Sequence, residues 1–313
     1  MADPQVEALV KQILARLPTS PDLDSAVKQV VDELETFLPG FSEHRAAEIA
    51  AARRKVEREF ESVQVLHRYS VFNPRQRWYF GPSPTDRHWP ALKQYMLNKG
   101  WAPSDVESLD VASNEVVSLI EDPRKEKLSC RGMVVGHVQS GKTANMTSVI
   151  AKAVDAGYNT VIVLAGLTNK LRYQTQSRLF EDLVKRNELD WNVRTPNLED
   201  VDFRAPPQGG FLSNIGNAQI AVVKKNVSPL RQLKIAVQGT HPIALRRLRT
   251  LIIDDECDQA SVNAGRGEFD VTAINENIRE LLGMFPAVTY IGYTATPFAN
   301  VLIDPYRTDS LNG

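Results

Sequence analysis

Residues 136–143 match the phosphate-loop motif GxxxxGK(S/T) at every defined position. The motif works between a strand and a helix, and the sequence has a short apolar run at 132–135 and a helical pattern at 142–154. Its glycines let backbone N–H groups surround phosphates, its lysine reaches the β and γ phosphates, and its hydroxyl can bind Mg²⁺. The motif therefore predicts a nucleotide phosphate site formed by Gly136, Gln139, Ser140, Gly141, Lys142 and Thr143.

The chain from residue 128 to 313 alternates short runs rich in Val and Ile with helix-length segments. Short apolar strands that alternate with helices are typical of a parallel α/β sheet covered on both faces. We therefore predict an α/β fold for residues 128–313, preceded by a mainly α-helical region over residues 1–127. The expected strands are 132–135, 160–164, 218–223, 250–254 and 288–293, and the expected helices are 142–154, 171–186 and 274–282.

The first part of the chain shows three helical stripes, at 4–17, 27–38 and 42–69. Residues 69–101 differ, because they hold eight aromatic residues and five Arg or Lys against one Asp. Such a segment can stack on bases or on adenine beside phosphates, or it can form a small aromatic core that joins two parts of the fold. Three prolines, Pro82, Pro84 and Pro90, predict a structured loop there rather than a regular element.

Consecutive carboxylates follow the expected strand at 250–254. Ligands of parallel α/β sheets bind outside the carboxyl ends of the strands, so these side chains are expected to face the phosphate loop. Asp255 is suited to hold Mg²⁺ together with Thr143, and Glu256 is suited to orient and deprotonate a water. The candidate catalytic residues are therefore Lys142, Asp255 and Glu256.

A third group of small hydroxyl residues, Thr294 and Thr296, ends the last expected strand just before Pro297. In that position the two hydroxyls can sense whether the γ phosphate is present. By itself this segment would be only a strand ended by proline.

The three motifs, in this order, resemble motifs I, II and III of superfamily 2 DExD-type helicases and translocases. The segments GHVQSGKTAN, VVKKN, LIIDDECDQASVN and YTATPFAN are similar to the Z-one (Z1) domain family, which includes ATPase subunits of ATP-dependent bacterial restriction endonucleases of the Corynebacterium and Neisseria type. The resemblance covers about residues 130 to 300. It implies a RecA-like lobe, hydrolysis of ATP with Mg²⁺, action on double-stranded DNA and a separate nuclease subunit.

The resemblance also implies that Thr294 and Thr296 couple the nucleotide to nucleic acid, and it implies a nucleic-acid surface. Thr168 and Asn169 occupy the place of motif Ia, and further candidates for phosphate contacts are Arg172, Lys224 and Lys225. Adenine is recognised in superfamily 2 by a glutamine upstream of the phosphate loop, and Gln64, Gln76 and Gln94 all stay open for that role. Stacking of adenine on Trp78 or Tyr79 is an equally open alternative.

Only 16 residues follow Pro297, where a superfamily 2 motor begins its second RecA lobe. We therefore expect residues 128–313 to be the first of two lobes, able to bind nucleotide but slow to hydrolyse it alone. One alternative is a nucleotide-gated DNA or protein binding module with little hydrolysis. Another is a metal-dependent nuclease, which the lack of an HNH, HxK or PD-(D/E)xK pattern disfavours.

Composition excludes other classes of protein. The formal net charge of -1 gives no global positive field, so any nucleic-acid binding is local. The two cysteines lack metal-ligand spacing, which argues against structural zinc and for a reducing compartment. No apolar run approaches the roughly 18 residues of a membrane span, and the first residues are not those of a signal peptide. We expect a cytoplasmic protein that does not enter a membrane.

Overall fold

The computed structural model describes residues 4–16, 23–61, 77–135, 141–206, 216–257 and 268–294. The chain divides into two compact units, one of residues 1–64 and 139–141 and the other of residues 65–138 and 142–313. We call them the helical unit and the sheet unit.

The helical unit contains α1 (Pro4–Arg16), α2 (Leu23–Phe37), α3 (Phe41–His44) and α4 (Ala46–Glu61). Its core is formed by Leu9, Val10, Ile13, Ala26, Val30, Ala52 and Val56. The third expected helix is interrupted at Arg45, between α3 and α4. The preceding turn is held by the Glu35 carboxylate, which accepts hydrogen bonds from the backbone N–H groups of Gly40 (2.6 Å) and Ser42 (2.8 Å).

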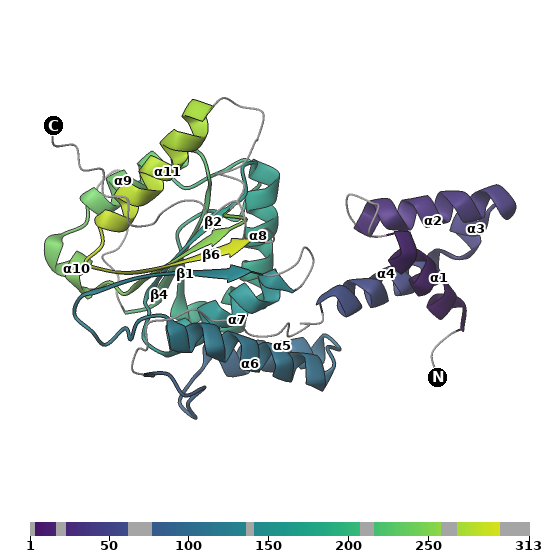
Figure 1. The fold of residues 1–313 in the computed structure, drawn as a ribbon, viewed down its shortest axis with the longest axis horizontal. Coiled ribbons are helices and arrows are strands. Elements are labelled where there is room, and N and C mark those ends of the chain that lie inside the picture. The colour runs from purple at the N-terminus through teal and green to yellow at the C-terminus, as the bar shows by residue number, and fades with distance from the viewer. Residues whose placement is uncertain are drawn as a thin grey trace, which may run out of the picture. The chain divides into compact units, whose positions relative to one another are not determined.

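The sheet unit is built on six parallel strands in the order β1-β6-β5-β2-β4-β3 (Figure 1). The strands are β1 (Leu128–Val135), β2 (Thr160–Ala165), β3 (Trp191–Val193), β4 (Ala218–Lys224), β5 (Thr250–Asp255) and β6 (Ala287–Thr294). The five expected strands are confirmed, and so is the α/β fold class. The edge strand β3 was not predicted, because three residues are too few to show a hydrophobic pattern.

Helices cover both faces of this sheet. On one face lie α7 (Lys142–Asp155) and α8 (Asn169–Asp182), and on the other lie α9 (Val227–Gln238) and α11 (Glu268–Gly283), as right-handed crossovers require. Alternate residues of the strands, such as Ile162 of β2 and Ile252 of β5, enter the core under α9 and α11. Their neighbours therefore point to the α7 and α8 face. Short elements complete the connections: α10 (Pro242–Arg247) and two 3-10 turns, Val184–Arg186 and Glu188–Asp190.

Two further helices, α5 (His88–Asn98) and α6 (Pro103–Leu119), pack on α7 and form an outer layer (Figure 1). They belong with the sheet unit rather than with the helical region that we predicted to end at residue 127. The prediction of a loop over 69–101 is wrong for α5. Pro90 is the third residue of this helix, where the missing N–H has no intrahelical acceptor to lose.

The start of α5 is held by the last residue of α7. The Asp155 carboxylate accepts hydrogen bonds from the backbone N–H groups of Arg87 (3.0 Å), His88 (2.9 Å) and Trp89 (2.8 Å). These donors at a helix start lack acceptors within the helix, so a carboxylate from another helix satisfies them. This capping contact explains why α5 forms despite its proline.

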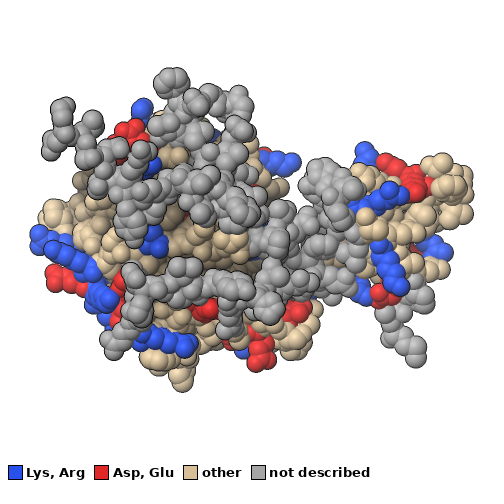
Figure 2. All heavy atoms as spheres, in the orientation of Figure 1, with Lys and Arg blue, Asp and Glu red and all other residues tan. Residues whose placement is uncertain are grey.

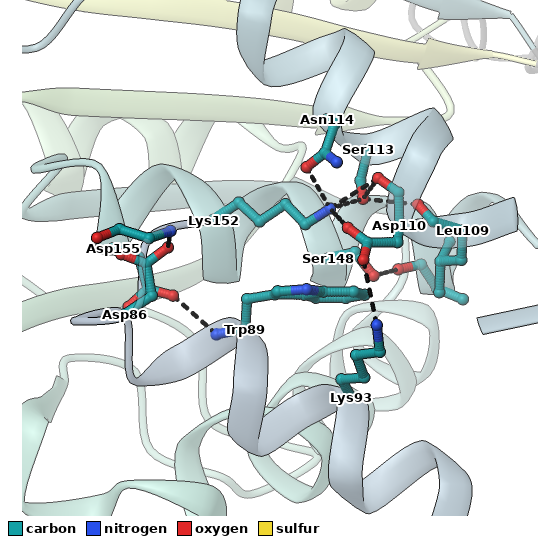
Figure 3. Close-up of polar contacts among 12 residues, drawn as sticks. Asp86, Trp89, Lys93, Leu109, Asp110, Ser113, Asn114, Ser148, Lys152 and Asp155 are labelled. Atoms are coloured by element: carbon teal, nitrogen blue, oxygen red, sulfur yellow. Dashed lines mark hydrogen bonds and ion pairs between the residues drawn. The ribbon is translucent and has the colours of Figure 1, made fainter. Parts of the chain in front are cut away.

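The side chain of Lys152, from α7, ties α5 and α6 to the sheet (Figure 3). Its buried ammonium donates to the carbonyl (2.7 Å) and carboxylate (2.6 Å) oxygens of Asp110, to Ser113 Oγ (2.8 Å) and to Asn114 Oδ1 (2.7 Å). It also lies 4.1 Å from the centroid of the buried Trp89 ring. Part of the aromatic segment thus forms an internal core, as one of the two alternatives predicted.

The surface of the described residues carries charges of both signs. On the face shown in Figure 2, lysines and arginines lie among aspartates and glutamates, in keeping with the net charge of -1. Among the described helices, none has the length and apolar character needed to cross a membrane.

Replacing Asp155 by Ala tests the cap of α5. We expect Asp155→Ala to lower the free energy of unfolding by about 1–2 kcal/mol, because three N–H groups lose their acceptor. Tryptophan fluorescence during urea unfolding reports the sheet unit, which contains all 4 tryptophans. Asp200→Ala, at an exposed carboxylate, is the control and should leave stability unchanged. An equal loss in both variants would contradict the capping role.

The pH dependence of stability tests the burial of Lys152. Burial lowers the pKa of its ammonium from 10.5 to about 8, against the opposing effect of Asp110. Between these values the unfolded chain binds more protons, so the stability contributed by Lys152 rises with pH. Relative to Lys152→Met, the free energy of unfolding of the wild type should rise by about 3 kcal/mol across that range. Lys125→Met, which removes an exposed lysine that pairs with Glu121, should keep the wild-type pH dependence.

Candidate nucleotide-binding site

The phosphate-loop lysine and threonine begin the helix that follows β1. Lys142 and Thr143 are the first two residues of α7, and Gly141 before them has a φ of +72°, which favours glycine. The N-terminus of α7 therefore lies at the carboxyl edge of the parallel sheet, where nucleotide phosphates are expected. Three of the predicted phosphate ligands, Gly136, Gln139 and Ser140, lie outside the described residues, as does Thr296.

The two aspartates at the end of β5 point to opposite faces of the sheet. Asp254 follows the alternation of Ile252 and lies on the α9 and α11 face, where it is buried. There the Tyr290 hydroxyl donates to Asp254 Oδ2 (2.8 Å), and the Lys225 ammonium lies 3.1 Å from Oδ1. Asp255 is partly exposed and points to the opposite face, which α7 covers. Because side chains alternate along the strand, Asp254 is buried on one face of the sheet and Asp255 faces the phosphate-loop helix on the other.

The electrostatic environment links Asp255 to the phosphate-loop lysine. Burial raises the pKa of the Asp255 carboxyl, and the positive charges of Lys225 and Lys142 oppose this effect. Lys142 is therefore close enough to stabilise the ionised carboxylate. A divalent cation bound near the start of α7 would favour the ionised carboxylate in the same way.

The predicted contact of Lys225 with nucleic acid is wrong, because its side chain is fully buried. Its Nζ donates to the backbone carbonyl oxygens of Asp255 (2.6 Å) and Glu256 (2.6 Å) and forms the ion pair with Asp254. The ammonium thus has two hydrogen-bond acceptors and one ion-pair partner, all within the protein.

Glu256 has a strained backbone. Among the described residues it alone combines a side chain with a positive φ, of 54°. The left-handed conformation costs about 1–2 kcal/mol for a residue other than glycine. Strain of this kind persists where surrounding contacts hold the chain, and it concentrates at functional sites. The residue predicted to orient the attacking water is thus held in a conformation that an unconstrained chain would avoid.

Strand β6 places Thr294 between β1, which leads into the phosphate loop, and β5, which carries Asp255. Thr294 pairs in register with Val135, the last residue before the phosphate loop, and Tyr293 pairs with Asp255. The Tyr293 hydroxyl donates to Asn145 Oδ1 (3.0 Å) in the first turn of α7. Strands lie about 4.8 Å apart, so β1 and β5 are separated by about 10 Å, with β6 between them. Thr294 is buried there, and its coupling role stays a prediction.

A close contact between β6 and the end of β5 fixes the path after Glu256. The backbone N–H of Cys257 donates to the carbonyl oxygen of Tyr293 (2.9 Å). A Cβ at Gly292 would lie 2.8 Å from the Cys257 Sγ, so glycine leaves the space that this side chain occupies.

Three of the predicted nucleic-acid contacts form one group at the ends of β2 and β4. Thr168 caps α8, since its hydroxyl accepts from the backbone N–H of Leu171 (3.2 Å), and Lys224 Nζ donates to Asn169 Oδ1 (2.6 Å). Gly166, just before them, has a φ of +48°, and a Cβ there would lie 2.5 Å from the Leu171 Cβ. Thr168 is exposed, while Asn169 and Lys224 are partly exposed, so a phosphate strand can reach them.

The same prediction is wrong for Arg172, whose side chain is fully buried. Its guanidinium donates to Gln176 Oε1 and to the carbonyl oxygens of Leu198 (2.6 Å) and Glu199 (3.0 Å). Burial lowers the pKa of Arg172, with the acidic groups of Asp202 and Glu199 opposing. The arginine anchors the chain around residue 198 to α8 and is withdrawn from solvent.

The candidates for adenine recognition lie in different settings. Gln94 is exposed on α5 and donates to Asn98 Oδ1 (3.0 Å), whereas Gln64 and Gln76 lie outside the described residues. The Trp78 ring packs 5.6 Å from the Tyr79 ring, and its Nε1 donates to the carbonyl oxygen of Ile120 (2.6 Å). The contacts of these two rings are internal to the fold.

The donor set fits Mg²⁺ held together with a substrate. Within the described ranges, no three His, Cys, Asp or Glu side chains are placed to hold a metal by themselves. Mg²⁺ in nucleotide sites takes one or two protein ligands and completes its shell with water and phosphate oxygens. Thr143 and Asp255, at the carboxyl edge of the sheet, provide hydroxyl and carboxylate ligands of that kind.

The sequence matches no protein-family model and no curated protein. The resemblance to the Z1 family therefore depends on the motifs themselves.

Sequence reasoning missed the residues that hold the site together, Tyr290, Tyr293 and Asn145, and gave Lys225 the wrong role. Alternation along β6 could have placed the two tyrosines on opposite faces. No sequence signal names their partners, which come from other strands and helices.

Gly292→Ala tests the close packing at the end of β5. We expect a loss of about 1–3 kcal/mol in the free energy of unfolding, because the new Cβ overlaps the Cys257 Sγ. Adding Cys257→Ala should recover most of that loss, so the two changes are not additive. Gly283→Ala is the control, since a Cβ there meets nothing within 4 Å. Additive losses in the double variant, measured by urea unfolding, would contradict the proposed contact.

Proposed function

We propose that this chain carries the ATP-binding lobe of a superfamily 2 motor of the Z1 type, which couples hydrolysis of Mg-ATP to action on double-stranded DNA. One observation carries the proposal: Lys142 and Thr143 begin the helix on the face toward which Asp255 points, at the same edge of the sheet. The motif resemblance adds a bacterial restriction system, a separate nuclease subunit and a cytoplasmic setting.

Each residue has a role that follows from its chemistry. Lys142 offsets negative charge that develops on the transferred phosphoryl group. Thr143 and Asp255 would hold Mg²⁺, which neutralises charge on the phosphate oxygens when it is bound. Glu256 orients the attacking water and accepts its proton. Thr294 and Thr296 link the occupancy of the site to the rest of the chain.

Fewer residues remain as candidate nucleic-acid contacts than the sequence suggested. Thr168, Asn169 and Lys224 remain as candidate contacts, because they gather at the ends of β2 and β4 with their polar groups in reach of solvent. Strand β2 is the direct neighbour of β5, so a phosphate strand at this group would lie close to Asp255. Arg172 and Lys225 are excluded from it by burial.

ATP turnover tests the proposal. In the intact subunit, Lys142→Ala and Glu256→Gln should each lower DNA-stimulated hydrolysis by about 10²-fold or more, because one removes charge stabilisation and the other removes the base. Glu256→Gln should still bind a fluorescent ATP analogue with Mg²⁺, since the phosphate loop is intact. Undiminished turnover in both variants would refute the proposed site.

Assays with double-stranded DNA separate the alternatives. Stimulated turnover without cleavage of the DNA supports a motor. Binding of ATP by the intact subunit without turnover, in the presence and absence of DNA, would instead indicate a nucleotide-gated binding module. Cleavage of the DNA by this chain alone would overturn the proposal in favour of a nuclease.

A further inference from the structure

We propose that Lys225 is a positioning residue that holds the backbone of Asp255 and Glu256 at the carboxyl end of β5. The positioning stands on the contacts of the chain itself, and only its effect on turnover rests on the proposed function.

The backbone around Glu256 lies beyond the hydrogen-bonded pairing of β5 with β2. Pairing between β2 and β5 ends at Leu164 and Asp254 and does not extend to the next two residues. Backbone carbonyl groups that are withdrawn from solvent need a donor. The Lys225 ammonium supplies it, with a distance of 2.6 Å to each of the two oxygens. A side chain thus replaces the strand that is missing at this position.

The opposite side of the same segment is held by β6. Pairing between β5 and β6 reaches Asp255 and Tyr293, and the N–H of Cys257 then donates to the Tyr293 carbonyl oxygen. Glu256 is therefore fixed from both sides, by β6 through Cys257 and by β4 through Lys225. Such double anchoring is what a left-handed non-glycine residue requires to persist.

Lys225 is itself fixed in place by its backbone and its charge. Its N–H donates to the carbonyl oxygen of Gly166 (3.0 Å), the residue directly after β2, and its ammonium is paired with the buried Asp254. Asp254 is in turn held by the Tyr290 hydroxyl. The chain of contacts therefore joins the ends of β4, β2 and β5 to Tyr290 in the middle of β6.

The adjacent lysine shows that the role is specific to one position. Lys224 is partly exposed, and its ammonium donates to Asn169 rather than to the end of β5. Lys225 does not point to the α7 face, where the phosphate-loop lysine lies. It therefore acts on the reaction through the direction in which Asp255 and Glu256 are held, and through its positive charge, which favours the ionised Asp255 carboxylate.

The experiment compares Lys225→Met with Lys225→Met combined with Asp254→Asn, which also removes the carboxylate left without its ion pair. The first readout is the rate at which N-ethylmaleimide labels Cys257, resolved from Cys130 by peptide mass spectrometry. Cys257 follows Glu256 directly, and Cys130 in β1 reports general unfolding. The second readout is kcat and KM for ATP with double-stranded DNA. Lys170→Met, at an exposed lysine of α8, is the matched control.

We expect Cys257 labelling to rise about tenfold in the double variant while Cys130 labelling stays at the wild-type rate, because the opening is local. In the same variant kcat should fall about 10²-fold with KM nearly unchanged, since misplacing a catalytic group by about 1 Å has an effect of that size. Lys170→Met should match the wild type in both readouts.

Two results would overturn the positioning role: wild-type labelling of Cys257 in the double variant, or faster labelling of both cysteines together. If Cys257 labelling rises as expected but the wild-type protein hydrolyses no ATP, the positioning holds and the proposed function fails. If labelling rises and KM increases while kcat is unchanged, Lys225 does not position the groups that carry out the chemical step, and its link to catalysis is refuted.

Discussion

The ammonium of Lys225 lies among two backbone carbonyl oxygens and a buried carboxylate at the carboxyl end of β5. A buried charge is tolerated when it is paired and hydrogen-bonded, and this ammonium has two carbonyl acceptors and one carboxylate ion-pair partner. These contacts hold the chain where β5 extends beyond its hydrogen-bonded pairing with β2. There the chain turns at Glu256, whose left-handed backbone conformation costs free energy. The position of both candidate catalytic carboxylates therefore depends on this one side chain.

A second buried lysine plays a comparable part on the other side of the phosphate-loop helix. Lys152 uses its ammonium to collect acceptors from α6 and packs against the Trp89 ring of α5 (Figure 3). Asp155, three residues later, caps α5. The last turn of the helix that starts at Lys142 is thus held by polar contacts with the outer helices. Its first turn is joined to the sheet by the hydrogen bond from the Tyr293 hydroxyl to Asn145 Oδ1.

The strands and the site motifs were predictable because their signals are local. Apolar runs at 160–164 and 250–254 identify buried strands without reference to the rest of the chain. The helix α5 was not predictable in the same way, because Pro90 argued for a loop and the carboxylate that caps the helix belongs to Asp155, far along the chain. The strand β3 was too short to produce a pattern. The aromatic segment allowed two interpretations, a nucleotide or nucleic-acid surface and an internal core. The Trp89 ring beside Lys152 belongs to an internal core.

The sequence by itself determined that a parallel α/β sheet carries a phosphate loop, an acidic strand end and a hydroxyl pair in a set order. The residue types in these motifs and the alternation of the strands suffice for that conclusion. Only the tertiary structure decided which basic residues can reach a ligand. Arg172 and Lys225 look like Lys224 in the sequence, but their acceptors come from residues about 30 positions away, and burial removes both from solvent. The role of a charged side chain depends on the acceptors that folding brings to it, and these lie outside its sequence neighbourhood.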